Sequence, residues 1–250
     1  MSRESLAGRV ALVTAGGRGL GAEIARELGR RGADVAFTYR RDEQAAGALC
    51  AELVGLGRRA VGFVAEAADF ARAAAVVAAT RAQLGGLDIL VCNAGVARGV
   101  PLVRMTEEDW DAVLDVTLKG TFNYLRAAAP GLVDQRRGKI ICIGSINGLR
   151  GRIGTASYNA AKAGLVGLMK TAAAELGPAQ VNVNLVAPGF VETPSQITTP
   201  ELIRDLVQKE TALRRLGTPA DIAPVVAFLA SDAAAHVTGQ VIKVDAGQYL

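Results

Sequence analysis

Short, continuously apolar runs alternate along the chain with longer stretches of helical pattern. The apolar runs predict strands over residues 9–14, 34–39, 60–64, 87–92, 139–144, 181–187 and 241–244. The longer stretches predict helices over residues 22–31, 42–56, 70–84, 106–129, 158–176, 200–214 and 219–230. Such alternation favours parallel strands that are buried on both faces. We therefore expect an α/β fold, a single Rossmann-like doubly wound parallel sheet with helices on both faces, spanning residues 1–250.

Composition narrows the class of protein. Half of the 250 residues are hydrophobic and 21% are charged, which suits one large domain with a filled core. No apolar run is long enough to cross a membrane, and the first residues lack an apolar signal segment, so we expect a cytoplasmic protein without a membrane partner. The net charge of +4 comes from scattered basic residues, which gives no nucleic-acid footprint but favours an anionic small molecule.

Metal and histidine chemistry have little support in the residue inventory. The three cysteines, Cys50, Cys92 and Cys142, lack metal-type spacing, so no metal site is expected. Cys92 and Cys142 lie in apolar runs and are interpreted as small buried hydrophobes. The single histidine, His236, excludes a His-based catalytic triad.

A glycine-rich segment follows the first predicted strand and precedes the first predicted helix. It consists of Ala15, Gly16, Gly17, Arg18, Gly19, Leu20 and Gly21. Strand, glycine turn and helix is the context of a dinucleotide-binding loop, because glycines let the backbone approach a pyrophosphate and the helix N-terminus attracts its charge. In such sheets ligands bind at the carboxyl ends of the strands. Other candidates also end strands: residues 39–41, residues 93–95, Ser145, Pro188 and Gly189.

Tyr158 and Lys162 lie four residues apart at the start of a predicted helix, which places both side chains on one face, one turn apart. A free Tyr titrates near ~10, and a nearby cation favours the phenolate and moves the pKa toward neutrality. Ser145, at the end of the strand over 139–144, is placed to donate to a bound carbonyl oxygen. The same spacing is also typical of a plain amphipathic helix edge, so the wider context decides between the two readings.

The residues after the second strand indicate which nicotinamide the loop would hold. NAD-binding folds usually carry an acidic residue about 20 positions beyond the glycine loop, on the ribose 2′-hydroxyl. Here Tyr39 stands at the strand end, followed by Arg40 and Arg41, whose guanidinium groups suit a 2′-phosphate, as does Arg18. We expect NADP(H), while Asp42 leaves NAD(H) open.

Together these segments resemble the short-chain dehydrogenase/reductase family over essentially the whole chain. The resemblance rests on residues 14–21, 93–95, 145, 158–162, 184–189, 215–221 and 238–247. It implies that Tyr158 is the acid/base, that Lys162 lowers the Tyr158 pKa and binds the nicotinamide ribose, and that Ser145 polarises the substrate oxygen. It also implies cofactor contacts from Asn93, Ala94, Gly95, Pro188, Gly189, Val191 (at the carboxamide) and Thr193 (near the phosphates).

The nearest subgroup looks like the 3-oxoacyl-carrier-protein and acetoacetyl-CoA reductases. This likeness implies a mobile substrate lid over about 190–216, whose side chains Phe190, Gln196, Ile197 and Leu202 suggest an apolar pocket. It also implies a homotetramer built through helices over about 106–130 and 157–176 and through the C-terminal strand and helix.

Several positions depart from the family pattern. Ala15 stands where the loop normally begins with Gly; its added methyl group either crowds the turn or is compensated by Gly16 and Gly17. Glu66 replaces an Asp that contacts adenine and is followed by Ala67, and Cys92 replaces an Asn. Thr117 stands where a catalytic Asn is expected, whose backbone carbonyl holds a water that links the Lys to solvent. Because a backbone carbonyl does this work, a Thr is compatible with it, but its branched side chain is expected to alter the local helix. Ala179 and Gln180 replace a docking Arg of carrier-protein reductases, which favours CoA thioesters or free small ketones.

These observations predict an NADP(H)-dependent oxidoreductase that reduces a ketone, a 3-oxoacyl thioester or a similar small carbonyl, with Tyr158 as proton donor. Two alternatives stay open. One is a dehydrogenase that oxidises a polyol, cyclic alcohol or steroid, and the other is a non-catalytic nucleotide-binding partner subunit.

Overall fold

The computed structural model describes residues 2–193 and 200–250. Within these residues a seven-stranded sheet is parallel throughout, in the order β3-β2-β1-β4-β5-β6-β7. The strands are β1 (Val10–Val13), β2 (Asp34–Tyr39), β3 (Ala60–Val64), β4 (Ile89–Cys92), β5 (Gly138–Ile143), β6 (Val181–Pro188) and β7 (Val241–Val244). The predicted doubly wound α/β fold is confirmed, and the predicted strand ends differ from these by at most two residues.

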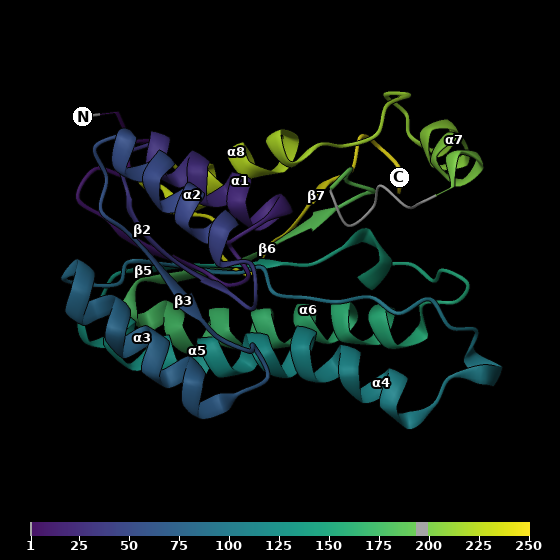
Figure 1. Ribbon diagram of the computed structural model, residues 1–250, viewed down its shortest axis with the longest axis horizontal. Helices are drawn as coiled ribbons and strands as arrows, with labels where there is room; N and C mark the ends of the chain where they lie inside the picture. The colour runs from purple at the N-terminus through teal and green to yellow at the C-terminus, as the bar shows by residue number, and fades with distance from the viewer. Residues whose placement is uncertain (1, 194–199) are drawn as a thin grey trace.

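Helices cover both faces of the sheet (Figure 1). They are α1 (Gly19–Arg30), α2 (Glu43–Gly55), α3 (Phe70–Leu84), α4 (Glu107–Leu114), α5 (Gly120–Asp134), α6 (Ala156–Leu176), α7 (Glu201–Glu210) and α8 (Pro219–Ala230). One face carries α1, α2 and α8, and the other carries α3, α5 and α6 (Figure 1). Among the helices of the described residues, none is both long and apolar enough to span a bilayer.

Each strand supplies side chains to two separate cores. In β1, Val13 faces the core under α1 and α8, while Leu12 faces the core under α3, α5 and α6. Burying a Val or Leu side chain stabilises the fold by about 1.5–3 kcal/mol, so both faces of a strand must be apolar for both helical layers to pack. Cys92 and Cys142, paired in register on β4 and β5, are buried in the second core, as predicted.

The helix predicted over 106–129 differs from the observed one. It begins as expected, with a capping box between Thr106 and Asp109. The chain then widens into a π-helical turn over Asp115–Lys119 before continuing as α5. Within this stretch the hydroxyl of Thr121 donates to the carbonyl of Thr117 at 2.8 Å. Such a side-chain bond offers the backbone an alternative to the regular ladder, and apolar periodicity carries no trace of it.

The helix predicted over 200–214 is shorter in the structure and ends at Glu210. Thr211 has extended backbone angles, and its hydroxyl donates to the carbonyl of Gln208 at 2.8 Å. Arg214 has a φ of 56°, in the left-handed region. Neither backbone conformation continues a right-handed helix.

The carboxyl ends of β1 and β4 form the point from which the chain winds in opposite directions. β1 is paired with β2 on one side and with β4 on the other. The turn into α1 lies at this point and is packed without space for a side chain at Gly21. A Cβ there would overlap the carbonyl oxygen of Ala15 and lie 2.5 Å from Nδ2 of Asn93.

This packing predicts that Gly21→Ala lowers the free energy of unfolding by about 2 kcal/mol or more, because backbone atoms must move to admit the methyl group. Gly47→Ala is the matched control, since a Cβ at Gly47 of α2 meets nothing within 4 Å. It is expected to stabilise the protein by about 0.5–1 kcal/mol through helix propensity. Urea unfolding of the two variants measures both changes in the free energy of unfolding. Equal stability of Gly21→Ala and the wild type would contradict the packing argument.

Candidate active site

Two polar side chains tie the glycine loop to the neighbouring strand end. The hydroxyl of Thr14, at the end of β1, accepts hydrogen bonds from the N–H groups of Asn93 and Ala94, at 2.9 and 3.0 Å. In return, Nδ2 of Asn93 donates to the carbonyls of Thr14 and Ala15, at 3.1 and 3.2 Å. The four bonds lock the start of the loop against β4. Thr14 belongs to the predicted motif, but its linking role depends on a partner 79 residues away.

Ala15 fits into the turn at the expense of backbone strain. Its φ is 50°, in the left-handed region that favours glycine. Its N–H donates to the hydroxyl of Thr38 on β2 at 2.8 Å, which holds this conformation. The methyl group is exposed and therefore does not crowd the turn as the sequence suggested. The cost is conformational instead, about 1–2 kcal/mol for a residue with a Cβ.

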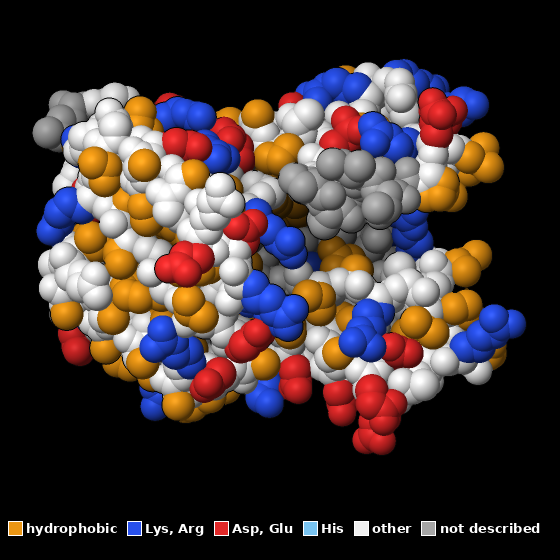
Figure 2. All heavy atoms as spheres, viewed as in Figure 1, with side chains coloured by type: hydrophobic (Ala, Val, Ile, Leu, Met, Phe, Trp, Pro, Cys, Tyr) orange, Lys and Arg blue, Asp and Glu red, His pale blue; other side chains and the backbone are white. Residues whose placement is uncertain are grey.

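Two adjoining cavities follow the carboxyl edge of the sheet. The larger, of about 330 Å³, is lined by Ala15, Gly17, Arg18, Thr38, Tyr39, Arg40, Arg41, Asp42, Ala65, Glu66, Ala67, Ala94, Gly95, Val96 and Val116. The smaller, of about 210 Å³, is lined by Ala15, Arg18, Gly19, Leu20, Gly21, Asn93, Gly95 and Thr193. The two share the start of the glycine loop. Figure 2 shows a hollow near the middle of this face with basic side chains along it.

Most residues predicted to bind a cofactor therefore lie together. Gly16 is an exception, because it is buried with its α-carbon against Phe37, where a Cβ would lie 2.6 Å from the Phe37 Cβ. Sequence reasoning missed Thr38, Ala65, Val96 and Val116 as lining residues. They end or follow apolar runs and carry no chemical signal of their own. Asp42, which left NAD(H) open, caps α2 by accepting from the N–H of Ala45 at 2.9 Å.

The arginines at this edge are not equivalent. Nε of Arg40 lies 2.6 Å from Oε1 of Glu66, and both side chains are about half exposed, at 53% and 54%. Arg18 and Arg41 have no ion-pair partner within residues 2–193 and 200–250. Positive charge available to an anionic ligand therefore comes chiefly from Arg18 and Arg41, while Arg40 is partly neutralised. Exposed ion pairs of this kind contribute little to stability, typically ~0–1 kcal/mol.

Tyr158, Lys162 and Ser145 converge beside the cavities. Lys162 is 5% exposed, and its Nζ lies 5.7 Å from the centre of the Tyr158 ring. The same Nζ donates to the carbonyl of Ile143, the last residue of β5, at 2.6 Å. Ser145 lies two residues further on, and its hydroxyl accepts from the N–H of Asn147 at 3.1 Å. Lys162 thus connects the face of α6 that carries Tyr158 to the end of β5.

Burial controls the ionisation of this pair. It raises the pKa of Tyr158, and the hydrogen bond with the Ser145 side chain opposes that rise. It also lowers the pKa of Lys162 to about 8, with the thiol of Cys142 acting in the opposite direction. Burial is thus the larger influence on the Tyr158 pKa, and the lowering by Lys162 that the resemblance implies stays a prediction. Both groups share one poorly solvated space, which disfavours the charged form of each.

Thr117 closes the inner wall of the site. It is fully buried in the π-helical turn, and its hydroxyl accepts from the N–H of Val96 at 3.3 Å. A Cβ on Gly95 would lie 3.4 Å from Nζ of Lys162 and 3.5 Å from Oγ1 of Thr117. The Thr117 carbonyl, expected to hold a water, already accepts the Thr121 hydroxyl.

The segment after β6 reaches the glycine loop from the other side. Val191 forms an isolated bridge with Gly217, and a Cβ on Gly19 would lie 3.7 Å from Cβ of Thr193. Thr193 is thus beside the loop predicted to hold phosphates. Of the predicted lid side chains, Leu202 is exposed on α7. Gln196 and Ile197 lie outside the described residues.

The sequence matches known proteins along nearly its whole length. A family model described as enoyl-(acyl carrier protein) reductase matches residues 14–248. The chain is 40% identical over 240 residues to 3-oxoacyl-(acyl-carrier-protein) reductase FabG of Staphylococcus aureus, covering 96% of this chain and 98% of that protein. It is 39% identical over 242 residues to the FabG of Thermotoga maritima, covering 97% and 98%. The chain belongs to the short-chain dehydrogenase/reductase family.

Solved structures agree with this membership. A dehydrogenase/reductase from Sinorhizobium meliloti superposes with a TM-score of 0.94 at 37% identity, covering 99% of this chain and 98% of that one. A variant of a Serratia marcescens short-chain dehydrogenase/reductase superposes with a TM-score of 0.92 at 36% identity, covering 97% and 98%. This short-chain dehydrogenase/reductase is accordingly an oxidoreductase, and the family implies a nicotinamide cofactor. The cavities along the glycine loop, with Arg18 and Arg41 among their lining residues, fit such a group.

The depressed pKa of Lys162 predicts a pH-dependent stability. Between about 8 and the ordinary value of 10.5 the unfolded chain binds more protons at this lysine than the folded protein does. The stability of the wild type therefore rises with pH in that window. Lys162→Met removes this dependence, so the free energy of unfolding of the variant relative to wild type is expected to fall as pH rises from 8 to 10.5. Urea unfolding across the window measures it, and Lys170→Met, an exposed position on α6, controls for loss of a lysine.

Proposed function

We propose that this protein is an NADP(H)-dependent reductase that acts on a ketone, a 3-oxoacyl thioester or a similar small carbonyl. The observation that carries the proposal is the convergence of Tyr158, Lys162 and Ser145 beside a cavity that follows the glycine loop. The names of the FabG relatives support the thioester class. Because Ala179 and Gln180 stand where carrier-protein reductases have a docking Arg, CoA thioesters and free ketones are favoured over carrier-protein substrates.

The cofactor contacts follow from the residues at the sheet edge. Backbone N–H groups at the start of α1 would hold the pyrophosphate, since an N-terminus attracts negative charge. Arg18 and Arg41 would pair with the 2′-phosphate, and Tyr39, Glu66 and Ala67 would border the adenosine. Asn93, Ala94, Gly95, Pro188, Gly189, Val191 and Thr193 would border the remaining length. When bound, the reduced nicotinamide supplies the hydride.

The proton chemistry belongs to the buried Tyr158. Because burial raises its pKa, the phenol stays protonated at neutral pH and suits the role of proton donor to the substrate oxygen. Ser145 would donate a hydrogen bond to the same oxygen. Lys162, held by the carbonyl of Ile143, would bind the ribose and stabilise the phenolate that remains after proton transfer. Thr117 would hold the backbone of Gly95 and Val96 in position beside Lys162.

Alternative reactions are separated by a substrate panel. Oxidation of a polyol, cyclic alcohol or steroid would appear as reduction of NADP⁺. The description of the matching family model brings in an enoyl thioester as a further control substrate. A non-catalytic nucleotide-binding subunit would bind cofactor without turnover on any member of the panel. The homotetramer, the cytoplasmic location and the lid over about 190–216 stay predictions from the sequence.

Tyr158→Phe is expected to reduce turnover of acetoacetyl-CoA by about a thousandfold or more, because removing an acid/base group typically loses 10²–10⁴ in rate. NADPH binding should persist, since the ring remains. Tyr124→Phe, which removes a hydroxyl buried under α5, is the matched control and is expected to keep its turnover. NADPH oxidation followed by absorbance gives the rates. Substantial turnover by Tyr158→Phe would refute the assignment of this residue.

Arg41→Ala is expected to weaken NADPH binding by about 10- to 100-fold, the range for one lost charge-assisted hydrogen bond to a phosphate. NADH binding should change little, because NADH lacks the 2′-phosphate. Arg126→Ala, exposed on α5 away from the cavities, is the control. Calorimetric titration of both nucleotides measures the effect. An equal loss for NADPH and NADH would contradict a 2′-phosphate contact.

A further inference from the structure

Gln248 is a buried polar residue that the chemistry above does not use. It lies after β7 and is 6% exposed. Its Oε1 accepts from the N–H of Phe190 at 3.0 Å, and its Nε2 donates to Oε2 of Glu210 at 3.0 Å. Its backbone carbonyl accepts from Nη1 of Arg150 at 3.3 Å. Burying an amide is costly unless such bonds are made, so the three contacts hold its position firmly.

The three partners of Gln248 come from separate segments that border the proposed site. Phe190 follows the turn after β6, where the nicotinamide would lie. Arg150 is connected to Ser145 by a short 3-10 turn over Ile146–Gly148. Glu210 is the last residue of α7, in the predicted lid. The side chain and the backbone carbonyl of Gln248 therefore link three segments around the proposed substrate site: the turn after β6, the loop after Ser145 and the end of α7.

Packing around Gln248 leaves little freedom. A Cβ on Gly189 would lie 2.8 Å from Oε1 of Gln248, so the turn after β6 is pressed against this amide. Gly247 has a φ of 71°, and a Cβ there would lie 2.7 Å from Cβ of Ala212, just beyond α7. These two glycines allow the segment after β7 to enter between the turn and the lid.

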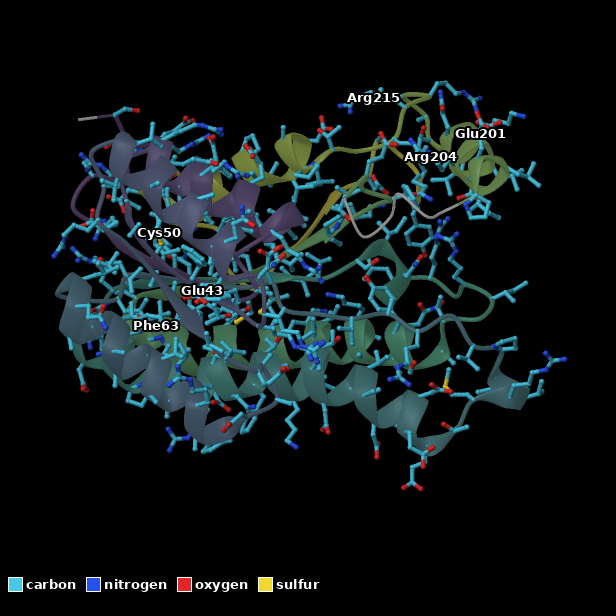
Figure 3. The ribbon with its side chains drawn as sticks, in the orientation of Figure 1. Glu43, Cys50, Phe63, Glu201, Arg204 and Arg215 are labelled. Atoms are coloured by element: carbon cyan, nitrogen blue, oxygen red, sulfur yellow. The ribbon has the colours of Figure 1, made fainter. Side chains whose placement is uncertain are left out.

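Further contacts connect the residues after β7, the loop after Ser145 and α7. The hydroxyl of Tyr249 donates to the carbonyl of Leu149 at 3.3 Å, and the guanidinium of Arg150 lies 5.8 Å from the Tyr249 ring centre. Nη2 of Arg150 also lies 3.3 Å from Oε2 of Glu210. Figure 3 places Arg204 on α7, and an ion pair joins it to Glu192. The lid helix is thus held at its last residue by Gln248 and Arg150.

We infer that Gln248 is a positioning residue for the carbonyl substrate, holding the Phe190 backbone and the end of α7 in register with the Ser145 loop. The inference rests on the proposed function, because the substrate in question is the ketone. Without the amide, Glu210 and the N–H of Phe190 lose a shared partner, and the substrate wall between them loosens. The glycine loop and the adenosine end are remote from this contact and keep their geometry.

A charge change at this position supplies a sharp test. The hydrogen bonds from Gln248 and Arg150 hold the pKa of Glu210 below its ordinary value, so Glu210 is ionised at neutral pH. Gln248→Glu would bring a second carboxylate against it, near Asp245 and near Arg150 and Arg152, the two arginines that act on Glu210, while Lys243 lies against the neighbouring Tyr249. Two carboxylates this close cannot both ionise readily, so one takes up a proton as the pH falls. The shared proton then restores the hydrogen bond that the amide made.

The expected result for Gln248→Glu is a KM for acetoacetyl-CoA about fivefold or more above wild type at pH 8, the scale of one lost buried hydrogen bond. At pH 5.5 this KM should return toward that of wild type, while the KM for NADPH stays within about twofold at both pH values. Gln248→Ala should raise the ketone KM at both pH values. Gln44→Ala, exposed on α2, is the control.

A second measurement does not need turnover. Hydrogen exchange of the amides of α7 should speed up in Gln248→Ala and, at pH 8, in Gln248→Glu, with the amides of α1 unchanged. Unchanged exchange in α7, or a ketone KM of Gln248→Glu that is independent of pH relative to wild type, would overturn the inference. If the wild type reduces no ketone, the proposed function fails, and exchange in α7 still decides the role of Gln248. Thermal unfolding confirms that each variant is folded.

Discussion

The bonds exchanged between Thr14 and Asn93 hold together the part of the molecule on which the site depends. The chain continues from β1 to one edge of the sheet and from β4 to the other, so the carboxyl ends of this strand pair are where a crevice opens. The Thr14 hydroxyl accepts two N–H groups and the Asn93 amide donates to two carbonyls, which satisfies backbone groups at the ends of the two strands. The start of the glycine loop is positioned by this junction.

The ionisation of Tyr158 and Lys162 depends chiefly on their poor solvation. Lys162 is buried against the carbonyl of Ile143, and its pKa is lowered to about 8. Tyr158 is buried beside it, and its pKa is raised. A buried phenol that stays protonated at neutral pH suits the proton donation that the proposed reduction requires.

Local patterns in the sequence were enough to predict the fold and most of the residues that line the two cavities. Continuous apolar runs mark strands because both faces of the sheet are covered, and the spacing of Tyr158 and Lys162 survives because a helix has a fixed repeat. What the sequence did not reveal depends on contacts between distant residues. Arg40 meets Glu66 only because β2 and β3 end side by side. The π-helical turn at Thr117 leaves no mark in apolar periodicity, and the direction of the Tyr158 pKa shift depends on burial.

The junction of β1 with β4 also has a consequence for how the chain acquires its shape during synthesis. Val13, near the start of the chain, is paired with Val91 in the middle of the sheet. A growing chain that has not yet reached Asn93 lacks both the strand and the amide that hold the glycine loop. Contacts this far apart in sequence form late, since the intervening loop must close first. The glycine loop therefore lacks its bonds to β4, and keeps only those to β2, until roughly the first third of the chain and the whole of β4 have left the ribosome.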